Sequence, residues 1–477
     1  MTVDPRRWKA LAVLGVAYLM VVLDVSIVNV ALPSIQEDLG FSESGLQWVV
    51  SGYALTFGGL LLLGGRCGDL LGRRRLFMAG LLLFSGFSLL CGLAWSPGVL
   101  VLARMLQGTA AAILSPSVFS ITMVTFEEGP ERNRALGILG AIAGSGAAIG
   151  VLLGGFLTEY AGWQWVFFVN VPIGVLTFFL VPMFVRESRA VGMEHHFDAS
   201  GAITVTAGLM LFVYALTEAP KDGWLSPKVV ACFIGWAVLS AAFILIELRS
   251  RFPLVRLGIF RRRTLTSANG IGLILGTAMF GMFFLLTLYM QQVLHFSAVQ
   301  TGAGYLAVAL TAVVSSGVSQ ALVTRIGVKP VLAVGLALLA GGLVYFTQIS
   351  VHGSYASDLL PGFLLVGVGL GFSFVPISIA ALAGVEDKEA GLASGLINTN
   401  QQIGGAIGLA LLTTVATTRT DNLIADGTSR VVATVEGFQL AFWVAAAIAA
   451  AGVVVTLLAF RRGEPAVETQ PATAEAG

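Results

Sequence analysis

Apolar segments long enough to cross a membrane recur along the whole of this 477-residue chain. A transmembrane helix needs about 20 consecutive, mostly apolar residues. We find fourteen such segments, with boundaries good to about four residues, near 9–33, 45–65, 75–95, 99–124, 134–158, 166–185, 200–218, 229–248, 268–291, 301–323, 330–349, 358–382, 390–416 and 437–460. Only 11% of the residues are charged, whereas soluble domains carry about 25%. The chain therefore predicts an all-α polytopic membrane protein whose solvent is the lipid bilayer.

The basic residues indicate which side of the membrane each loop faces. Cytoplasmic loops are enriched in Lys and Arg, and an even number of spans places both termini on one side. If that side is the cytoplasm, all but five of the 27 Lys and Arg residues fall on it. The exceptions are Lys221, Lys228, Arg419 and Arg430 outside, and Arg104 within a span. We therefore expect a multi-pass plasma-membrane protein with both termini in the cytoplasm, and its preference for Arg over Lys is typical of a bacterial source.

Two parts of the chain repeat each other. Glycines of the fifth segment recur in the thirteenth at a constant spacing, Gly137, Gly146 and Gly150 matching Gly395, Gly404 and Gly408. GRRRLFMAG, which begins at Gly72, similarly resembles GVKPVLAVG, which begins at Gly327. Glycine spacing can also reflect helix packing alone. We predict a six-helix half over 1–186, a linker with two extra helices over 187–264, a second six-helix half over 265–462 and a disordered cytoplasmic tail over 463–477.

Two charged residues lie inside predicted spans, where a charge costs about 2.5–3.5 kcal/mol at a helix centre. Asp24 is in the first segment, about 13 Å below the outer face if that segment ends at Pro33. Arg104 enters the fourth segment from outside and lies about 8 Å deep, so its long side chain can reach Asp24. The pair is either a structural ion pair or a titratable, cavity-lining carboxylate with its partner. The second half has no acid in its predicted spans, so Asp24 is the leading candidate for a proton carrier.

Uncharged polar residues in the spans are candidates for binding a small molecule. They are Asn29, Gln47, Tyr53, Gln107, Tyr289, Gln292, Asn398 and Gln401. For any one of them, a hydrogen bond that joins two helices is an equally good explanation. The chain also contains 30 Phe residues, and aromatic side chains suit an apolar pocket with few polar anchors.

Several classes of function lack the residues that they need. The net charge of +1 and the absence of a basic domain argue against a nucleic-acid partner. The three cysteines, Cys67, Cys91 and Cys232, have neither metal-site nor disulfide spacing. His195 and His196 fall in a predicted cytoplasmic loop, and the sequence has no HExxH, phosphate-binding loop or nucleophile elbow. We therefore expect no enzyme, no metal site and no cofactor.

Four motifs have counterparts in one family of transporters. LDVSIVNVALP (residues 23–33) and LVLARMLQGTAAA (100–112) are similar to that family's signatures in helices one and four. GRCGDLLGRRR (65–75) resembles the signature loop between helices two and three, and WQWVFFVNVPIG (163–174) is another close match. Together the motifs resemble the major facilitator superfamily, specifically its fourteen-helix drug:proton antiporter family, over nearly the whole chain. The resemblance implies two halves that rock about a central site, and proton coupling through the charged pair of helices one and four.

The resemblance also implies residues that act in gating. In that family the loop between helices two and three serves conformational switching, which points to Gly65, Asp69, Gly72, Arg73 and Arg74. The glycines of helix five that permit bending and close packing are Gly150, Gly154 and Gly155. The family usually has Gly-Pro in helix five, whereas this chain has Gly150-Val151. Because proline removes a backbone hydrogen bond and kinks a helix, its absence keeps a symporter open as an alternative.

We predict a proton-coupled secondary antiporter that exports small amphipathic or lipophilic compounds by alternating access. Drugs, antibiotics and monovalent cations are the expected substrates, and a monomer is the expected state. Asp24 cannot comfortably hold a proton and a cation together, so one would displace the other. A dedicated exporter of one natural product, a proton-coupled symporter and a passive facilitator share these features. A receptor or scaffold that transports nothing would have no need of the buried pair.

Overall fold

The computed structural model describes residues 6–41, 43–127, 129–188, 198–250, 253, 255, 257–383, 385 and 390–460. Within these residues every regular element is a helix. The first part holds α1 (Arg7–Leu39), α2 (Glu43–Leu71), α3 (Arg73–Gly92), α4 (Pro97–Thr125), α5 (Pro130–Tyr160), α6 (Trp165–Phe168) and α7 (Asn170–Phe184). The middle holds α8 (Ala199–Asp222), α9 (Pro227–Arg249) and η1 (Leu257–Arg261). The last part holds α10 (Arg263–Leu288), η2 (Tyr289–Val293), α11 (Ala298–Gly304), α12 (Leu306–Ile326), α13 (Val328–Phe346), η3 (Tyr355–Leu359), α14 (Leu360–Leu382), α15 (Ala390–Ala425) and α16 (Arg430–Ala459).

In four places a short helix and a longer one run directly into each other, and the two form one continuous rod. These are α6 with α7, α10 with η2, α11 with α12, and η3 with α14. Apart from the short η1, the described residues then make fourteen rods, and each overlaps one predicted segment. Eleven are long and apolar enough to cross a membrane, and the other three are α2, α5 and α15. The predicted all-α membrane fold is confirmed.

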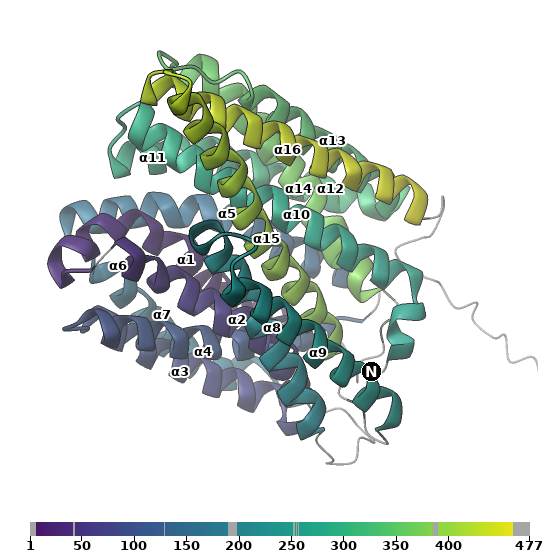
Figure 1. Ribbon diagram of the computed structural model, residues 1–477. Coiled ribbons are helices and arrows are strands. Elements are labelled where there is room, and N and C mark those ends of the chain that lie inside the picture. Colours follow the sequence, from purple (N-terminus) through teal and green to yellow (C-terminus); the bar gives the residue numbers. More distant parts are fainter. Residues whose placement is uncertain are drawn as a thin grey trace, which may run out of the picture.

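Two bundles of six rods lie against each other, with the two inserted helices beside them (Figure 1). The first bundle, α1 to α7, is purple to blue in the lower part of the view, and the second, α10 to α16, is teal to yellow and lies mainly in the upper part. The interface between them is formed by α5 against α11, α12 and α14, and by α15 against α2 and α4. A site between the halves is therefore bordered mainly by these helices and by α1 and α10, which pack on α5 and α15.

One matched pair of the glycine repeat has the same structural role in both halves. α5 packs on α1 in the first half, and α15 packs on α10 in the second. A Cβ at Gly150 of α5 would lie 3.0 Å from the carbonyl oxygen of Leu23 in α1. A Cβ at the matching Gly408 of α15 would overlap the carbonyl oxygen of Thr277 in α10. Gly150 and Gly408 thus let two helix backbones approach closely, as small residues commonly do inside membranes.

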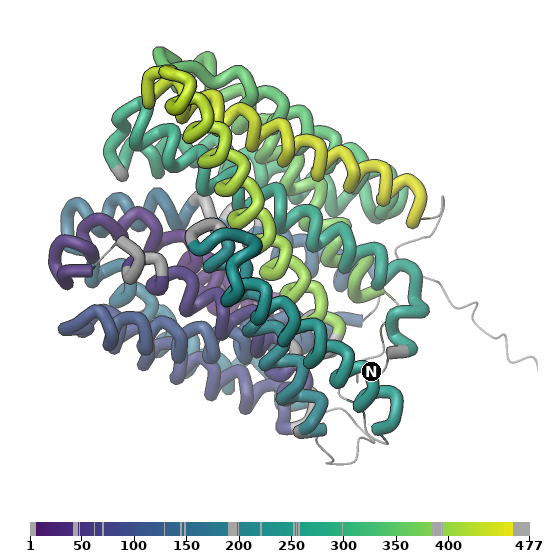
Figure 2. The backbone as a smooth tube through the Cα atoms, viewed as in Figure 1, coloured from purple at the N-terminus to yellow at the C-terminus, as the bar shows by residue number. Residues whose placement is uncertain are grey.

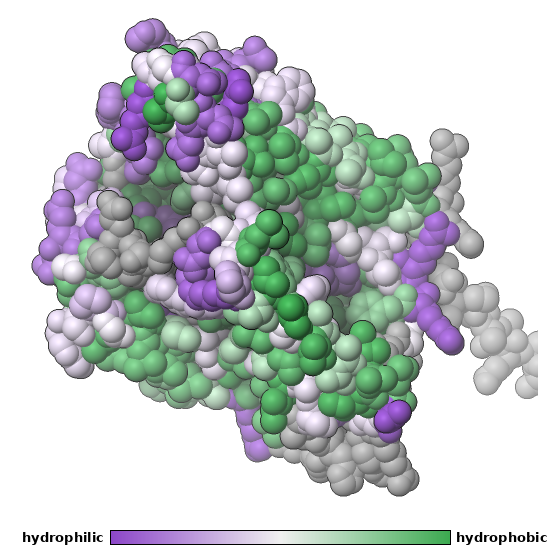
Figure 3. All heavy atoms as spheres, viewed as in Figure 1, coloured by the Kyte–Doolittle hydropathy of each residue, from purple (hydrophilic) through white to green (hydrophobic). Residues whose placement is uncertain are grey.

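The outer surface has the polarity expected of a protein in a bilayer. In Figure 3, apolar residues cover the middle of the face, and hydrophilic residues gather towards its left and right ends. Exposed apolar side chains include Ile203 on α8 and Val238 and Leu245 on α9, which are 67, 61 and 54% exposed. Soluble proteins rarely expose a continuous apolar surface of this kind. Lipid tails are the solvent that suits it.

The inserted helices α8 and α9 pack as a pair and contact both halves. α8 lies against α2 of the first half and α15 of the second, and Figure 2 shows the teal pair beside the yellow-green α15. After α8, Trp224 donates from Nε1 to Thr414 Oγ1 of α15 at 3.2 Å. On the other side, the ring of Tyr214 lies 5.6 Å from that of Trp48 in α2. The pair therefore covers one seam between the halves, a position that the sequence analysis did not predict.

The predicted outer end of the first span was wrong. We placed it at Pro33, but α1 continues through Pro33 to Leu39, where Gly40 ends the helix with a φ of 69°. Glycine adopts this left-handed conformation without steric cost. At 1.5 Å per residue, Asp24 lies about 22 Å from that end instead of about 13 Å. The charged residue is thus nearer the middle of the bundle than the sequence suggested.

Candidate functional site

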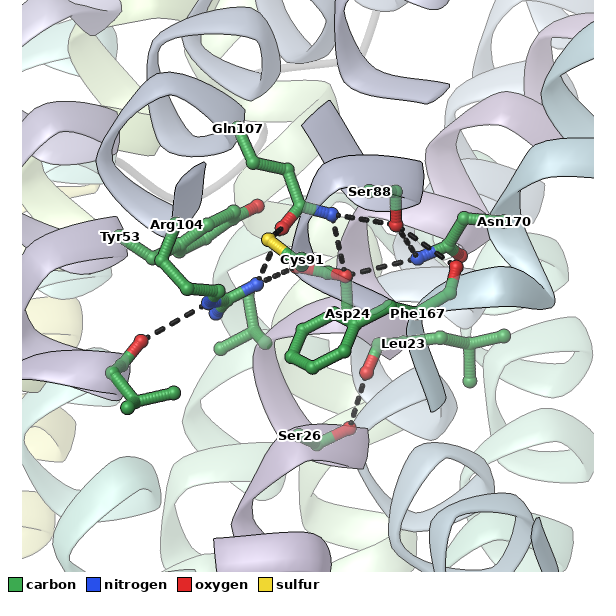
Figure 4. A network of polar contacts seen from close by, with 12 residues as sticks. Leu23, Asp24, Ser26, Tyr53, Ser88, Cys91, Arg104, Gln107, Phe167 and Asn170 are labelled. Atoms are coloured by element: carbon green, nitrogen blue, oxygen red, sulfur yellow. Dashed lines mark hydrogen bonds and ion pairs between the residues drawn. The ribbon is translucent and has the colours of Figure 1, made fainter. Parts of the chain in front are cut away.

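Asp24 is the centre of a buried polar network in the first half (Figure 4). Arg104 Nη1 lies 2.5 Å from Asp24 Oδ2 and forms an ion pair with it. Gln107 Nε2 and Asn170 Nδ2 donate to Asp24 Oδ1 at 2.8 and 2.9 Å. All four side chains are at most 2% exposed. The predicted contact between Asp24 and Arg104 is therefore confirmed, and the neighbouring helices seal it from solvent.

A serine on α3 joins the two amides of this network. Ser88 Oγ accepts hydrogen bonds from Gln107 Nε2 and Asn170 Nδ2, both at 3.0 Å. Ser88 donates its own proton to the carbonyl oxygen of Phe167 at 2.9 Å. On its other side, Gln107 Oε1 accepts from Arg104 Nη1 at 2.8 Å. These bonds link α1, α3, α4, α6 and α7 around one carboxylate.

The helix α2 holds the arginine from the opposite side. Arg104 Nε donates to the carbonyl oxygen of Val49 at 3.0 Å. The guanidinium lies 4.2 Å from the ring centroid of Tyr53 and 5.7 Å from that of Phe167. Such contacts between a cation and an aromatic face are favourable, more so away from water. Tyr53, predicted to bind substrate, is thus buried beneath the arginine, and Arg104 has partners besides Asp24.

Glycines of α5 bring that helix against the segment of α1 that carries Asp24. A Cβ at Gly150 would overlap the hydroxyl oxygen of Ser26, and one at Gly154 would lie 2.5 Å from a carbonyl oxygen of α1. Gly155 is also buried. Both contacts fall within one turn of Asp24. A movement of α5 would therefore press on the part of α1 that holds the carboxylate.

A small cavity lies where the two halves meet. It is lined by Tyr18, Phe119, Ala143, Phe374, Ser378, Leu382, Ile397, Asn398 and Gln401. Its volume of about 10 Å³ has room for one water molecule. Nearby, Ser115 Oγ of α4 donates to Asn398 Oδ1 of α15 at 3.3 Å. The halves are closed against each other at this level, and the structure brings the predicted Asn398 and Gln401 together in the wall between them.

A larger, open cavity of about 580 Å³ lies at the end that the charge bias predicts to be extracellular. It is lined by Gly40, Phe41, Trp48, Pro97, Gly98, Val101, Leu102 and Met105, from the ends of α1, α2 and α4. Its volume is within the range of ligand-binding pockets. Met105, which lines this cavity, directly follows Arg104 on α4. Asp24 and Arg104 themselves line neither cavity.

The remaining predicted polar residues lie apart from the cavity between the halves. Tyr289 is buried and donates to the carbonyl oxygen of Ser350 at 2.7 Å. Gln292 is exposed one turn further on. Asn29 is exposed and donates to a carbonyl oxygen of its own helix. The side chain of Gln47 lies outside the described residues. Tyr289 therefore holds a loop of the second half in place, and Gln107 belongs to the Asp24 network.

Two glycines with positive φ begin the matching helices α3 and α13. Gly72 has a φ of 108° and Gly327 a φ of 84°, values that residues with a side chain adopt with strain. The sequence repeat between these two loops thus reflects one backbone conformation used twice. Gly65 is buried within α2, and the side chain of Asp69 lies outside the described residues.

The arginines at the start of α3 contact the chain that follows α7. Arg73 is 1% exposed, and its backbone N–H donates to the carbonyl oxygen of Ser188 at 3.0 Å. The backbone N–H groups of Arg74 and Arg75 donate to the side-chain carboxylate of Glu187 at 3.1 and 3.2 Å. Glu187 therefore satisfies free N–H groups at the positive end of α3. Sequence reasoning missed this acid, whose signal was a glutamate that lies between Arg186 and Arg189.

A comparison with protein families supports these observations. The model of the Major Facilitator Superfamily matches residues 14–409, a range that includes the whole buried network. The chain belongs to the Major Facilitator Superfamily. It is therefore a multi-pass membrane transporter of small molecules and not an enzyme.

Several relatives that match most of the chain are named for antibiotic resistance or export. The chain is 40% identical to the puromycin resistance protein of Streptomyces alboniger, over 98% of this chain and 95% of that protein. It is 39% identical to the cephamycin export protein of Amycolatopsis lactamdurans, over 85% of this chain and 84% of that protein. The crystal structure of the human organic anion transporter MFSD10 shares the fold, with a TM-score of 0.67 and 15% identity. The match covers 95% of this chain and 100% of that chain. The predicted resemblance to the drug:proton antiporters is confirmed.

Two members of the network were missed in the sequence. Asn170 lies in the WQWVFFVNVPIG motif, and an amide within an apolar span was a signal that could have singled it out. Ser88 stands in an ordinary apolar segment, and serine is frequent where membrane helices pack. Only the packing of α3 against α4 and α7 brings its hydroxyl to the amides.

Proposed function

We propose that this transporter exports small amphipathic or lipophilic compounds, including antibiotics, in exchange for protons by alternating access. One observation carries the proposal: Asp24 is 0% exposed in the middle of a span and paired with Arg104. Ionisable residues inside membranes are costly and mark proton relays and substrate pathways. Asp24 is the proton carrier in this proposal, and Arg104 is the partner of its charged form.

The direction of transport is supported by the relatives. Their names describe resistance to puromycin, export of cephamycin, and resistance to and export of tetracenomycin C. We assign export to this chain by that similarity. A dedicated exporter of one natural product is the second candidate, because the puromycin resistance protein aligns over 98% of this chain. Broad and narrow exporters share the same architecture, so the choice depends on a panel of substrates.

The substrate site we propose lies between the halves, near Asn398 and Gln401. Every side chain that lines the small cavity there is uncharged, which suits uncharged or weakly charged amphipathic compounds. Asp24 does not line this cavity. Instead of a cation displacing the proton at Asp24, we propose that the two sites communicate through α1. Tyr18 lines the cavity and lies six residues before Asp24, about 9 Å along the helix.

Alternating access requires that the contacts between the halves break and re-form. We propose that the contacts near Ser115 and Asn398 close the cytoplasmic side, and that the loops beginning at Gly72 and Gly327 move as it opens. The remaining predicted gating residues are Gly65, Asp69, Arg73 and Arg74. In this proposal the protein acts as a monomer in the plasma membrane, with both termini in the cytoplasm.

The test is substrate-driven proton movement in proteoliposomes that enclose a pH-sensitive dye. The panel contains puromycin, other antibiotics and lipophilic cations. We expect substrate to drive protons in the opposite direction, and Asp24→Asn to abolish this while the exposed control Glu159→Gln retains it. Proton movement in the same direction as substrate would indicate a symporter, and transport that ignores a pH gradient would indicate a facilitator. Coupled exchange that persists in folded Asp24→Asn would refute the role of Asp24.

A further inference from the structure

The carboxylate of Asp24 faces hydrogen-bond donors on both of its oxygens. Oδ2 faces Arg104 Nη1 at 2.5 Å, and Oδ1 faces Gln107 Nε2 at 2.8 Å and Asn170 Nδ2 at 2.9 Å. A carboxylate accepts all three bonds, whereas a carboxylic acid needs an acceptor for its own proton. The arrangement therefore fits the charged form of Asp24, and uptake of a proton requires at least one of these neighbours to turn or move away.

Ser88 accepts from both amides and favours one orientation of each, which for Gln107 is also favoured by the bond from Arg104 to its Oε1. The hydroxyl proton of Ser88 is donated to the carbonyl oxygen of Phe167 at 2.9 Å, so its lone pairs must accept from the groups beside it. Those groups are the NH₂ of Gln107 and the NH₂ of Asn170, both at 3.0 Å. An amide that directs its NH₂ at Ser88 also directs it at Asp24 in this geometry (Figure 4). Ser88 thus keeps two donors aimed at one carboxylate oxygen.

Neither Ser88 nor Asn170 lines either of the two cavities described above. Ser88 is 0% exposed on α3, and Asn170 is 2% exposed at the first residue of α7. These two helices pack on each other and on α4 or α1, and neither forms the main interface between the halves. A substrate in either cavity does not touch these residues, so replacing them removes no contact with it.

The titratable groups around Asp24 come from several helices. α4 supplies Arg104, α2 supplies the phenol of Tyr53 under the guanidinium, and α3 supplies the thiol of Cys91, 3.6 Å from Gln107 Oε1. Among the described residues α7 supplies only the neutral amide of Asn170 at this point, and α5 supplies glycine. The amides and the serine are therefore uncharged groups that adjust a carboxylate already paired with one arginine.

We propose that Asn170, held by Ser88, is a positioning residue that sets the pH range over which the transporter exchanges protons. Its amide stabilises the charged form of Asp24 and must turn when that carboxylate takes a proton. The inference rests on the proposed function, because it assumes that Asp24 carries the proton. If it holds, residues of α3 and α7 also rearrange when Asp24 takes up or releases a proton.

The test is the pH dependence of substrate-driven proton release in proteoliposomes. Asn170→Leu and Ser88→Ala should raise the pH of half-maximal release by about one unit. The reason is that the charged carboxylate loses a charge-assisted hydrogen bond or its alignment, whereas the protonated form loses only a weaker, neutral one. Ser88→Thr keeps the hydroxyl and should restore the original midpoint. Ser85→Ala is the matched control, since Ser85 lies one turn away on α3 and its buried hydroxyl has no hydrogen-bond partner among the described residues.

The outcomes separate this inference from the proposed function. An unchanged midpoint in folded Ser88→Ala and Asn170→Leu, together with loss of coupling in Asp24→Asn, would overturn the inference and leave the proposed function intact. Coupling that survives in Asp24→Asn would overturn both. If Asn170→Leu does not fold, the comparison of Ser88→Ala with Ser88→Thr tests the inference, because the first variant removes the hydroxyl and the second keeps it. A midpoint that shifts equally in Ser85→Ala would show a general packing effect and overturn the inference.

Discussion

Removing one member of the buried ion pair should destabilise the protein more than removing both charges. In Asp24→Asn, Arg104 stays charged at 1% exposure without a counter-ion. Breaking a buried pair in this way costs about 3–5 kcal/mol. Arg104 would keep its bonds to Val49 O at 3.0 Å and Gln107 Oε1 at 2.8 Å, and its contact with the Tyr53 ring. We therefore expect the lower end of that range, about 3 kcal/mol.

The double variant Asp24→Asn/Arg104→Gln leaves no buried charge in the pair. Replacing a whole buried pair by neutral groups is often close to neutral, so we expect a loss of about 1 kcal/mol relative to the unmodified protein. The assay is unfolding of the purified protein by a denaturing detergent in mixed micelles. It is applied to the unmodified protein, to Asp24→Asn, to Arg104→Gln and to the double variant, which together form a double-mutant cycle. The double variant should be about 2 kcal/mol more stable than Asp24→Asn alone, and its loss should be well below the sum of the two single losses. If the two single losses simply add in the double variant, the electrostatic reasoning is refuted.

Two further substitutions test the packing around the site and the loop before α3. Gly150→Ala should reduce transport severalfold in liposomes, since its Cβ would overlap Ser26 Oγ, whereas Gly341→Ala on α13, where a Cβ meets nothing within 4 Å, should not. Equal rates in both would contradict the role given to the α1–α5 contact. Glu187→Ala should lower the free energy of unfolding by about 1 kcal/mol, because N–H groups at the start of α3 lose their acceptor. Unchanged thermal unfolding would argue against this capping role.

Most of the fold could be predicted from the sequence because the bilayer imposes simple rules. A span needs a fixed length of apolar residues, and each of the fourteen predicted segments overlaps a rod. The glycine repeat correctly indicated two related halves. The end of the first span was mistaken at Pro33, since proline near the end of a membrane helix is tolerated and α1 runs on to Leu39.

The candidate site was predictable only in part. Two opposite charges within spans have a strong reason to meet, because a single buried charge is costly, and Asp24 and Arg104 do meet. Gln107 was predicted to bind substrate, yet its amide lies in the Asp24 network. Tyr289 was predicted in the same role but holds a loop of the second half. Uncharged polar residues carry no such constraint, so sequence position alone does not say what they contact.

The sequence by itself determined that this chain lives in a membrane, that its spans form two related halves, and that one acid and one arginine pair within them. These properties follow from composition and spacing, because lipid penalises every unpaired charge and every exposed backbone group. Only the tertiary structure decided which groups surround the pair, that Ser88 and Asn170 complete it, and that α8 and α9 cover the seam between α2 and α15. Those contacts depend on the rotation of each helix about its own axis, which is set by packing against its neighbours and leaves no periodic signal in the sequence.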